Sequence, residues 1–438
     1  MRIIIVKRRA DGASLAPENG THAPTARPRP RPDRTPAHHG HRHGALRTAA
    51  GDRAVATPGA RRVLAWLLLP ILLLTVWGVI ASWPHDAPGR GVIDVTADTA
   101  GMVVGDVVGE ATPDGLVLVR LEDGTEVTVM FPPEHVEVGI PDGATVRALR
   151  VPEAAASGSA YVFMDYARQA PIALLAALYA LVVVAVARWR GIAAMLGLTA
   201  SFAIVVTYTM PSLLAGSPAL PVALLTSSVV MFMTLYLAHG ISARTSTALL
   251  GTMIGLGLTA ALAQGAATAA RITGLSDEYA RQLPAFAPAV DVQSLVTCGI
   301  VLAGLGVLND VTITQASAVW ELREVSPTLS RRELFRRGMR IGRDHIASTV
   351  YTIAFAYLGA ALPLLLTVSL INQSLTMTLT SGEIATEVVR TLVGSIGLVL
   401  AIPATTAIAA IVVAAPAGPA DAVGPGRPAL AETARPSP

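Results

Sequence analysis

Eight apolar stretches recur along the chain, and each is nearly free of charged residues. Each holds about 18 or more mostly apolar residues, the length that an α-helix needs to cross the roughly 30 Å hydrocarbon core of a bilayer. A buried helix of a soluble core is the alternative for any single stretch, but a long series with so little amphipathic patterning argues against it. The pattern predicts a polytopic α-helical membrane protein with about eight transmembrane helices, at residues 63–83, 170–187, 191–210, 220–239, 246–270, 292–313, 347–370 and 391–414.

Residues 85–167, between the first two stretches, follow a different pattern. Short apolar runs, such as 115–121 and 125–129, are separated by Pro-Asp-Gly and Glu-Asp-Gly triplets. Such triplets favour tight turns between strands, so the region is expected to be a small all-β domain. From Asp86 to Arg168 there are 14 acidic residues against 5 basic ones. An acidic excess beyond a basic-flanked anchor is typical of an extracytoplasmic domain.

The first apolar stretch has two interpretations, a cleaved signal peptide or a membrane anchor. A basic segment of some sixty residues precedes it, and its exit, Trp83-Pro84-His85, lacks a small-x-small cleavage pattern. We therefore expect residues 61–84 to be an uncleaved transmembrane signal anchor. The Arg-, Pro- and His-rich residues 1–60 and the residues 415–438 are expected to be disordered cytoplasmic tails. The remaining part, 168–414, is the expected seven-helix transmembrane bundle.

Composition supports the membrane assignment, since 52% of residues are hydrophobic and only 14% are charged. A soluble protein of 438 residues needs more charge to cover its surface. The basic residues are not interleaved with aromatic residues, so no nucleic-acid partner is expected. The single cysteine, Cys298, lies in an apolar stretch and cannot form an internal disulfide.

The distribution of arginine predicts the orientation of the spans. Arginine is concentrated in the short loops 188–190 and 240–245 and in residues 323–343, which hold seven arginines. Because basic residues favour the cytoplasmic side, both termini are expected in the cytoplasm and the β domain outside. The loops on the expected outer side are uncharged or mixed in sign, at 211–219, 271–291 and 371–390.

A polar cluster at the end of the sixth span is the strongest candidate site. Ionisable residues are costly inside a membrane, so Asp310 within an apolar run suggests function. On a helix it shares a face with Gly306, Thr314 and Ser317. One interpretation is a substrate or ion pathway; the alternative is a carboxylate that pairs with an arginine to fix helix packing. The pathway cluster contains Asp310, Asn309, Thr314, Gln315 and Ser317, and the alternative partners are Arg340 and Arg343.

A second cluster, Asp344 and His345, opens the seventh span. These side chains are expected either to relay protons or ions, because histidine titrates near neutral pH, or to cap and anchor the start of the helix. Near the last span, Glu387 and Arg390 lie on one helical face, which suggests a structural ion pair. Templates for a phosphate-binding loop, a zinc protease helix and a serine hydrolase elbow are all missing from the sequence. No enzyme activity, catalytic residue, metal or cofactor is therefore expected.

The last third of the chain contains a series of short motifs that resemble the YibE/F-like family of bacterial membrane proteins. They are GVLNDVTI at 306–313, ASAVWEL at 316–322, ELF at 333–335, GMRIGRD at 338–344, AYLG at 356–359 and LPLLL at 362–366, with Glu387, Arg390, GSIG at 394–397 and Pro403 near the end. The resemblance covers roughly residues 85–414 and implies an extracytoplasmic β domain followed by a membrane bundle in the bacterial inner membrane. Polar family positions match at Asp310, Glu321, Arg343 and Asp344, whereas Tyr351 stands where an asparagine is expected.

Two functions are consistent with these features. The first is a secondary transporter or permease for an ion or small solute, with Asp310 as the coordinating carboxylate. It rests on polar residues at membrane depth and on spans interrupted by glycine and proline. The second is a non-transporting membrane assembly or sensory protein whose β domain binds an envelope partner. The lipid bilayer is the expected partner in both.

Overall fold

A computed structural model of the chain describes residues 56–85 and 101–414, except the side chains of Glu153, Ala156 and Ser157. All of these residues belong to the unit Gly51–Pro438. Most of the expected tail 1–60 and all of the expected tail 415–438 lie outside the described residues.

Among the described residues, seven helices are long and apolar enough to cross a membrane, and a bent helix pair supplies an eighth candidate span. The eight spans expected from the sequence are reached when the bent pair is taken as one span. The seven are α1 (Pro58–Ala81), α3 (Gln169–Ala187), the run Trp189–Leu214, α6 (Ala219–His239), α7 (Ala243–Ala269), α9 (Val292–Val325) and α13 (Gly382–Val412). The run Trp189–Leu214 consists of α4 (Trp189–Ile204), a π-helical turn η2 (Val205–Thr209) and α5 (Met210–Leu214).

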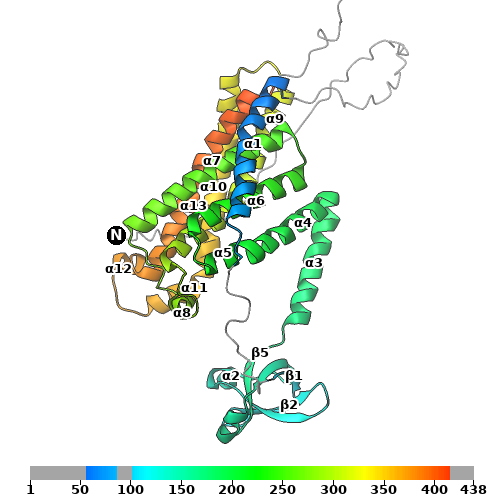
Figure 1. Cartoon of the computed structure of the whole chain (residues 1–438), viewed down its shortest axis with the longest axis vertical. Helices are drawn as coiled ribbons and strands as arrows, with labels where there is room; N and C mark the ends of the chain where they lie inside the picture. Colours follow the sequence, from blue (N-terminus) through cyan, green and yellow to red (C-terminus); the bar gives the residue numbers. More distant parts are fainter. Residues whose placement is uncertain (1–55, 86–100, 415–438) are drawn as a thin grey trace, which may run out of the picture. The chain divides into compact units, whose positions relative to one another are not determined.

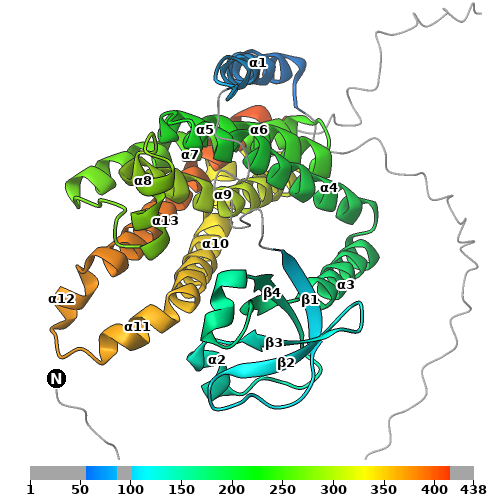
Figure 2. The ribbon, with the colours of Figure 1, turned by 60° about the horizontal axis from the view of Figure 1, so that its bottom comes forward.

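The centre of the bundle is formed by α7, α9 and α13, which contact one another extensively. Helix α6 packs on α7 and α9, and α10 (Arg331–Ala360) packs on α9 and α13, so α9 is surrounded on several sides (Figures 1 and 2). Helix α3 is different, because no residue of its apolar window is buried, against 56% of the corresponding window in α7. The bundle thus has a packed centre and an apolar periphery.

Helices α9 and α10 form a hairpin that is longer than the apolar stretches predict. Helix α10 begins after Ser330, whose side chain accepts a hydrogen bond from the amide of Glu333 while the Glu333 carboxylate accepts one from the amide of Ser330. The buried guanidinium of Arg323 donates to the carbonyls of Pro327 and Leu329, at 3.1 and 2.7 Å, and so holds the turn. Of the seven arginines expected in a loop before the seventh span, Arg323 therefore lies at the end of α9 and the other six lie on the first half of α10.

This boundary corrects the capping interpretation of Asp344 and His345. The two residues lie in the middle of α10, more than three turns after its N-terminal cap at Ser330. Their charges consequently have no role at a helix start, since the dipole effect is confined to the first turn. The capping-box pattern Ser330-x-x-Glu333 was the sequence signal for the true start.

The seventh span is broken, because α10 ends at Ala360 and α11 (Leu362–Ser369) leaves at an angle of 65°. Pro363 lies in the first turn of α11 and has no amide hydrogen to continue the helix, which accounts for the break. Two short helices lie in the connections: α8 (Glu278–Phe286) between α7 and α9, and α12 (Leu375–Leu379) between α11 and α13. Helix α13 then contains Pro403 without a break in its assignment.

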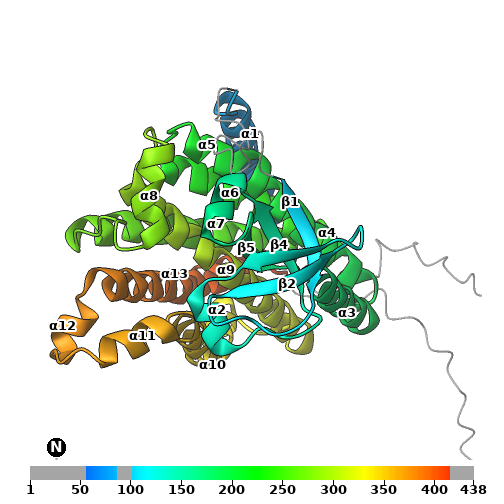
Figure 3. The same ribbon diagram turned by 90° about the horizontal axis from the view of Figure 1, so that it is seen from below.

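Residues 102–166 form the expected all-β domain, a closed five-stranded barrel (Figure 3). The strand order is β1-β2-β3-β5-β4, with β3 and β5 parallel and a short helix, α2 (Pro133–Val138), between β3 and β4. This is the topology of an OB-fold barrel. The strands are β1 (Met102–Val107), β2 (Leu116–Leu121), β3 (Glu126–Met130), β4 (Thr145–Arg150) and β5 (Tyr161–Tyr166), and a 3-10 turn, η1 (Pro152–Ser157), precedes β5.

The sequence correctly located the β2–β3 hairpin of the barrel. Val117 pairs with Val129, and Arg120 pairs with Glu126, across antiparallel strands. Gly124 closes the turn with φ +82°, a conformation that glycine adopts readily, while the Asp123 carboxylate accepts from the amide of Thr125 at 2.8 Å. The inward-facing residues form an apolar core of Val107, Val117, Val119, Val129, Phe131, Val146, Ala148 and Phe163.

The helical bundle has one basic and one acidic end. Ala56, just before α1, forms a β-bridge with Val413, just after α13, and the end of α9 and the start of α10 pack in the same cluster. Arg61, Arg244 and the arginines of the α9–α10 hairpin therefore lie toward this end. The opposite end carries Asp277, Glu278, Glu383 and Glu387 around one cavity, whose described lining residues include the single cation Arg390.

Candidate functional site

A line of fully buried polar side chains runs through the contact between α7, α9 and α13, and we call it the polar seam. In this seam the hydroxyls of Thr252 and Thr312 lie 2.6 Å apart, and Gln315 donates to the hydroxyl of Thr406 at 2.7 Å. Hydropathy alone does not reveal it, because these residues are scattered among apolar neighbours. The polar seam consists of Thr252, Thr259, Thr312, Gln315, Thr405 and Thr406, all with 0% exposure.

Gln315 is the point where α9, α10 and α13 meet. Both hydrogens of its amide nitrogen are used, one by the carbonyl of Gly338 at 2.9 Å and one by the hydroxyl of Thr406. The carbonyl of Gly338 can only accept, so it fixes which end of the amide faces α10. The other end, Oε1, is buried and has no hydrogen-bond partner among the described residues. Gln315 thus presents a free acceptor inside the bundle.

Two glycines of α10 make this contact with Gln315 close. A Cβ atom placed on Gly342 would lie 3.2 Å from both Oε1 and Nε2 of Gln315 and 2.6 Å from Ile402. A Cβ atom on Gly338 would lie 2.9 Å from Thr406. Small residues four positions apart let helices approach closely in membrane bundles. The GMRIGRD motif therefore places α10 directly over the amide.

The glycines of α7 serve the same purpose on the other side. The sequence suggests a close-packing face at Gly251, Gly255 and Gly257. Gly251 lies against Thr405, and a Cβ on Gly255 would lie 2.8 Å from Ala401, whereas a Cβ on Gly257 would meet no atom of another described element within 4 Å. The first two glycines belong to the contact with α13, and Gly257 faces elsewhere.

The threonines of the polar seam have a purely structural explanation. Each hydroxyl has a carbonyl acceptor one turn back on its own helix, for example Thr312 to Leu308 at 2.8 Å and Thr406 to Ile402 at 2.7 Å. Such bonds satisfy a hydroxyl inside a membrane helix without any ligand. The unpartnered oxygens differ, because a buried acceptor without a donor needs an explanation. On α9 these oxygens are Gln315 Oε1 and Asn309 Oδ1.

Asp310 lies on a different face of α9 from Gln315. It is exposed, as is Gly306, while Thr314 and Ser317 on the same face are half-buried. His239, at the end of α6, interacts electrostatically with Asp310 and also with Arg190 and Arg244. No ion pair joins Asp310 to Arg340 or Arg343 in the described part of the chain. The candidate cluster is therefore divided into a buried amide and an exposed carboxylate.

The candidate residues of α10 do not join either group. Arg340, Arg343 and Asp344 are exposed, and His345 is half-buried. The Ser348 hydroxyl donates to the carbonyl of His345 at 3.1 Å, a bond within the helix. Glu321, on the last part of α9, is exposed as well. Their roles as relay or packing residues remain predictions.

At the acidic end of the bundle, a cavity of about 610 Å³ lies between α8, α9, α11 and α13. Glu387 and Arg390 form an ion pair at 2.9 Å on its wall, as their spacing predicts. Glu278 also lines it, and hydrogen bonds from Gln282 and Arg281 hold the pKa of the Glu278 carboxyl below its usual value. Within the described ranges, no three His, Cys, Asp or Glu side chains are grouped as a metal site requires.

The family is settled by sequence comparison. The family model described as YibE/F-like protein matches residues 175–415, more than half of the chain, and the chain belongs to this family. No curated protein and no solved structure matches the chain. The match covers the helices from α3 onward, so α1 and the barrel lie outside it, in contrast to the expected range of 85–414.

Proposed function

We propose that this protein is a secondary transporter or permease for an ion or small solute, and that the solute passes the buried amide of Gln315. The observation that carries the proposal is the free Oε1 at the junction of α9, α10 and α13. Amide and carboxylate oxygens are ligands for hard cations and acceptors for polar solutes. The solute therefore carries positive charge or hydrogen-bond donors.

The helices next to Gln315 are suited to movement. Helix α10, which covers the amide, is linked to α11 by the 65° break at Ala361. The break lies 19 residues beyond Gly342, roughly 28 Å along the helix, and broken helices are a recurrent feature of secondary transporters. In this proposal, a shift of α10 away from its close contacts at Gly338 and Gly342 opens the amide to water.

Asp310 is the coupling carboxylate in this proposal, on the surface of α9 near His239. Arg190 and Arg244, which interact electrostatically with His239, lie at short loops, where the charge pattern favours the cytoplasm. In this orientation both termini are cytoplasmic, the barrel is extracytoplasmic and the acidic cavity faces outward. An acidic outer cavity attracts cations, which fits a cationic or donor-rich solute.

Ion flux into reconstituted vesicles tests the proposal. The full chain is reconstituted into vesicles loaded with a pH-sensitive dye, and proton movement is followed under an imposed potassium potential. The variant Asp310→Asn is expected to reduce flux to the level of empty vesicles, and Glu321→Gln, an exposed acid on the same helix, is expected to retain it. Equal flux in Asp310→Asn and the unmodified chain would exclude the coupling role.

A second function is favoured by the barrel. The barrel has its own apolar core, and OB-fold barrels commonly bind ligands across β2 and β3. The excess of acid in residues 86–168 disfavours a polyanion, so the partner would be an envelope protein. Deletion of residues 102–166 distinguishes the two functions, since a permease core would keep basal flux and a partner-binding protein would lose its function.

A further inference from the structure

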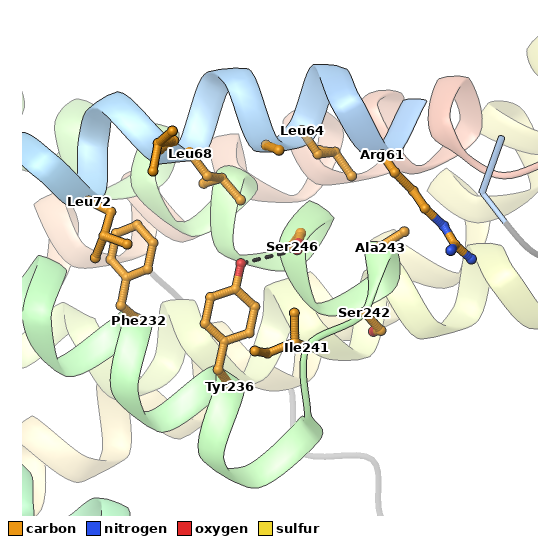
Figure 4. A pocket seen from close by; sticks show the side chains of 12 residues that line it. Arg61, Leu64, Leu68, Leu72, Phe232, Tyr236, Ile241, Ser242, Ala243 and Ser246 are labelled. Carbon is orange, nitrogen blue, oxygen red and sulfur yellow. Dashed lines mark hydrogen bonds between the residues drawn. The ribbon is translucent and has the colours of Figure 1, made fainter. Parts of the chain in front are cut away.

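A groove runs between α1 and the pair α6–α7. Its volume is about 590 Å³. Its long walls are apolar and include Leu68 and Leu72 of α1 and Phe232 of α6. Figure 4 shows Leu72 and Phe232 at one end and Arg61 beside Ala243 at the other. The groove is thus mostly apolar, with the guanidinium of Arg61 at one end.

The polar groups of the groove lie in its middle and at the end that carries Arg61 (Figure 4). The hydroxyls of Tyr236 and Ser246 lie 3.1 Å apart on its wall, and Ser242 caps the N-terminus of α7 there. The N-terminal end of a helix carries positive partial charge and adds to that of Arg61. No carboxylate of the described residues pairs with Arg61. This end of the groove is therefore suited to an anion.

The length of the groove corresponds to one leaflet. The α1 residues that line it run from Arg61 to Leu72, a rise of roughly 16 Å at 1.5 Å per residue. The hydrocarbon core of a bilayer is about 30 Å thick, so one leaflet spans about half of that. The end that carries Arg61 is the basic end of the bundle. An acyl chain of one leaflet would therefore place its headgroup at Arg61.

We propose that this groove holds an anionic phospholipid, with one acyl chain along Leu68 and Leu72 and the phosphate on Arg61. Charge distinguishes this occupant from the chain's own N-terminal segment, since residues 27–47 are rich in arginine and would repel Arg61. The lipid fills the space between the anchor and the bundle, so it tethers α1, which otherwise buries only a few side chains against α6 and α7.

Native mass spectrometry of the full chain tests this site. The purified chain is incubated with equal amounts of phosphatidylglycerol and phosphatidylcholine, and the retained lipid is weighed as an adduct. The unmodified chain is expected to retain phosphatidylglycerol in preference, and Arg61→Gln to lose that preference. Arg62→Gln is the matched control, because Arg62 neighbours Arg61 without lining the groove.

A second pair of variants tests the apolar wall. Ala65 lines the groove, so Ala65→Trp is expected to fill it and to remove the adduct, whereas Val63→Trp, on an exposed position outside the groove, is expected to keep it. If the unmodified chain retained both lipids equally, the headgroup assignment would be wrong. It would also be wrong if Arg61→Gln retained as much phosphatidylglycerol as Arg62→Gln. An adduct unchanged in Ala65→Trp would show that the lipid binds elsewhere.

Discussion

The barrel and the helical bundle both bury apolar side chains, but they differ in which polar residues they bury and which apolar residues they expose. The barrel has an apolar interior, and Ser159 is the only buried polar residue among its described side chains. The bundle buries threonines and Gln315 and exposes large apolar side chains along α1 and α3. Water explains the first arrangement, because apolar surface is driven inside. A lipid environment explains the second, because lipid acyl chains are as apolar as leucine and give no free-energy gain when leucine is buried.

The difference shows what holds each part together. The barrel gains its stability from burial of valine and phenylalanine away from water. The bundle centre gains it from close glycine contacts and from hydroxyl and amide hydrogen bonds, as at Gly342 and Gln315. An unpartnered acceptor is consequently more significant in the bundle, where water is scarce, than it would be in the barrel.

The largest effect is expected from a charge placed inside the barrel. Val117 has 0% exposure, and Val117→Asp should lower the free energy of unfolding of the barrel by about 4 kcal/mol or more, since the carboxylate would be buried without a partner. Its neighbour Leu118 is 38% exposed, so Leu118→Asp is the control. Hydrogen exchange across residues 116–130 measures both, and equal protection in the two variants would contradict the assigned interior.

A leucine-to-aspartate change on α3 tests whether the exposed face of this helix contacts lipid or water. Leu178 is 53% exposed, more than Leu118, and in a soluble protein Leu178→Asp would be tolerated. If the exposed face meets lipid, the change should disfavour membrane insertion of α3 by about 2.5–3.5 kcal/mol. A glycosylation-based insertion assay of the α3 segment reports this cost. Insertion as efficient as that of the unmodified segment would place α3 in water or against protein.

A smaller effect is expected at the glycine contact. Gly342→Leu inserts a side chain between Gln315 and Ile402 and should destabilise the bundle by about 1–3 kcal/mol. Gly359, on the same helix, has no atom within 4 Å of its added Cβ, so Gly359→Leu should leave stability almost unchanged. Thermal unfolding in detergent compares the two variants. Equal midpoints would show that α10 does not pack on α9 and α13 through Gly342.

The smallest effect is expected at Asp165, whose contribution to stability depends on pH. The hydrogen bond from Arg168, together with the amide of Tyr166, holds the pKa of Asp165 below its usual value. A carboxyl whose pKa is lower in the folded state stabilises that state above its unfolded pKa, near 4, and loses this contribution as the pH falls through the folded value. Asp165→Asn should therefore lower the melting temperature of the barrel slightly at pH 7, and this difference should shrink as the pH falls below 4. Samples of both proteins are heated at pH 7 or pH 3 and then labelled briefly at one common pH. The amide exchange at residues 161–166 reports the fraction of barrel that has unfolded in each sample.

The sequence was sufficient for the spans and the barrel because both depend on local patterns. Apolar length predicted the helices, and Asp-Gly turns predicted the hairpin at residues 122–125. Helix ends were missed where polar turns continue beyond the apolar stretch, as at Ser330. Gln315 was identified as a candidate, but its partner Thr406 lies 91 residues away, and no local pattern connects the two. Leu308, Thr312, Gln315 and Val319 are three or four residues apart and so lie on one face of α9. This spacing was the available signal for the polar seam.

The most direct test of the central claim is whether water and small ions reach position 315. The only cysteine in the sequence, Cys298, is replaced by alanine, and Gln315→Cys is compared with Val319→Cys, an equally buried apolar position one turn further on. Each variant is treated in vesicles with a small charged methanethiosulfonate reagent. A solute path predicts that the cysteine at 315 reacts and the one at 319 does not. If both remain unmodified, Gln315 only joins helices, and the transport proposal is contradicted.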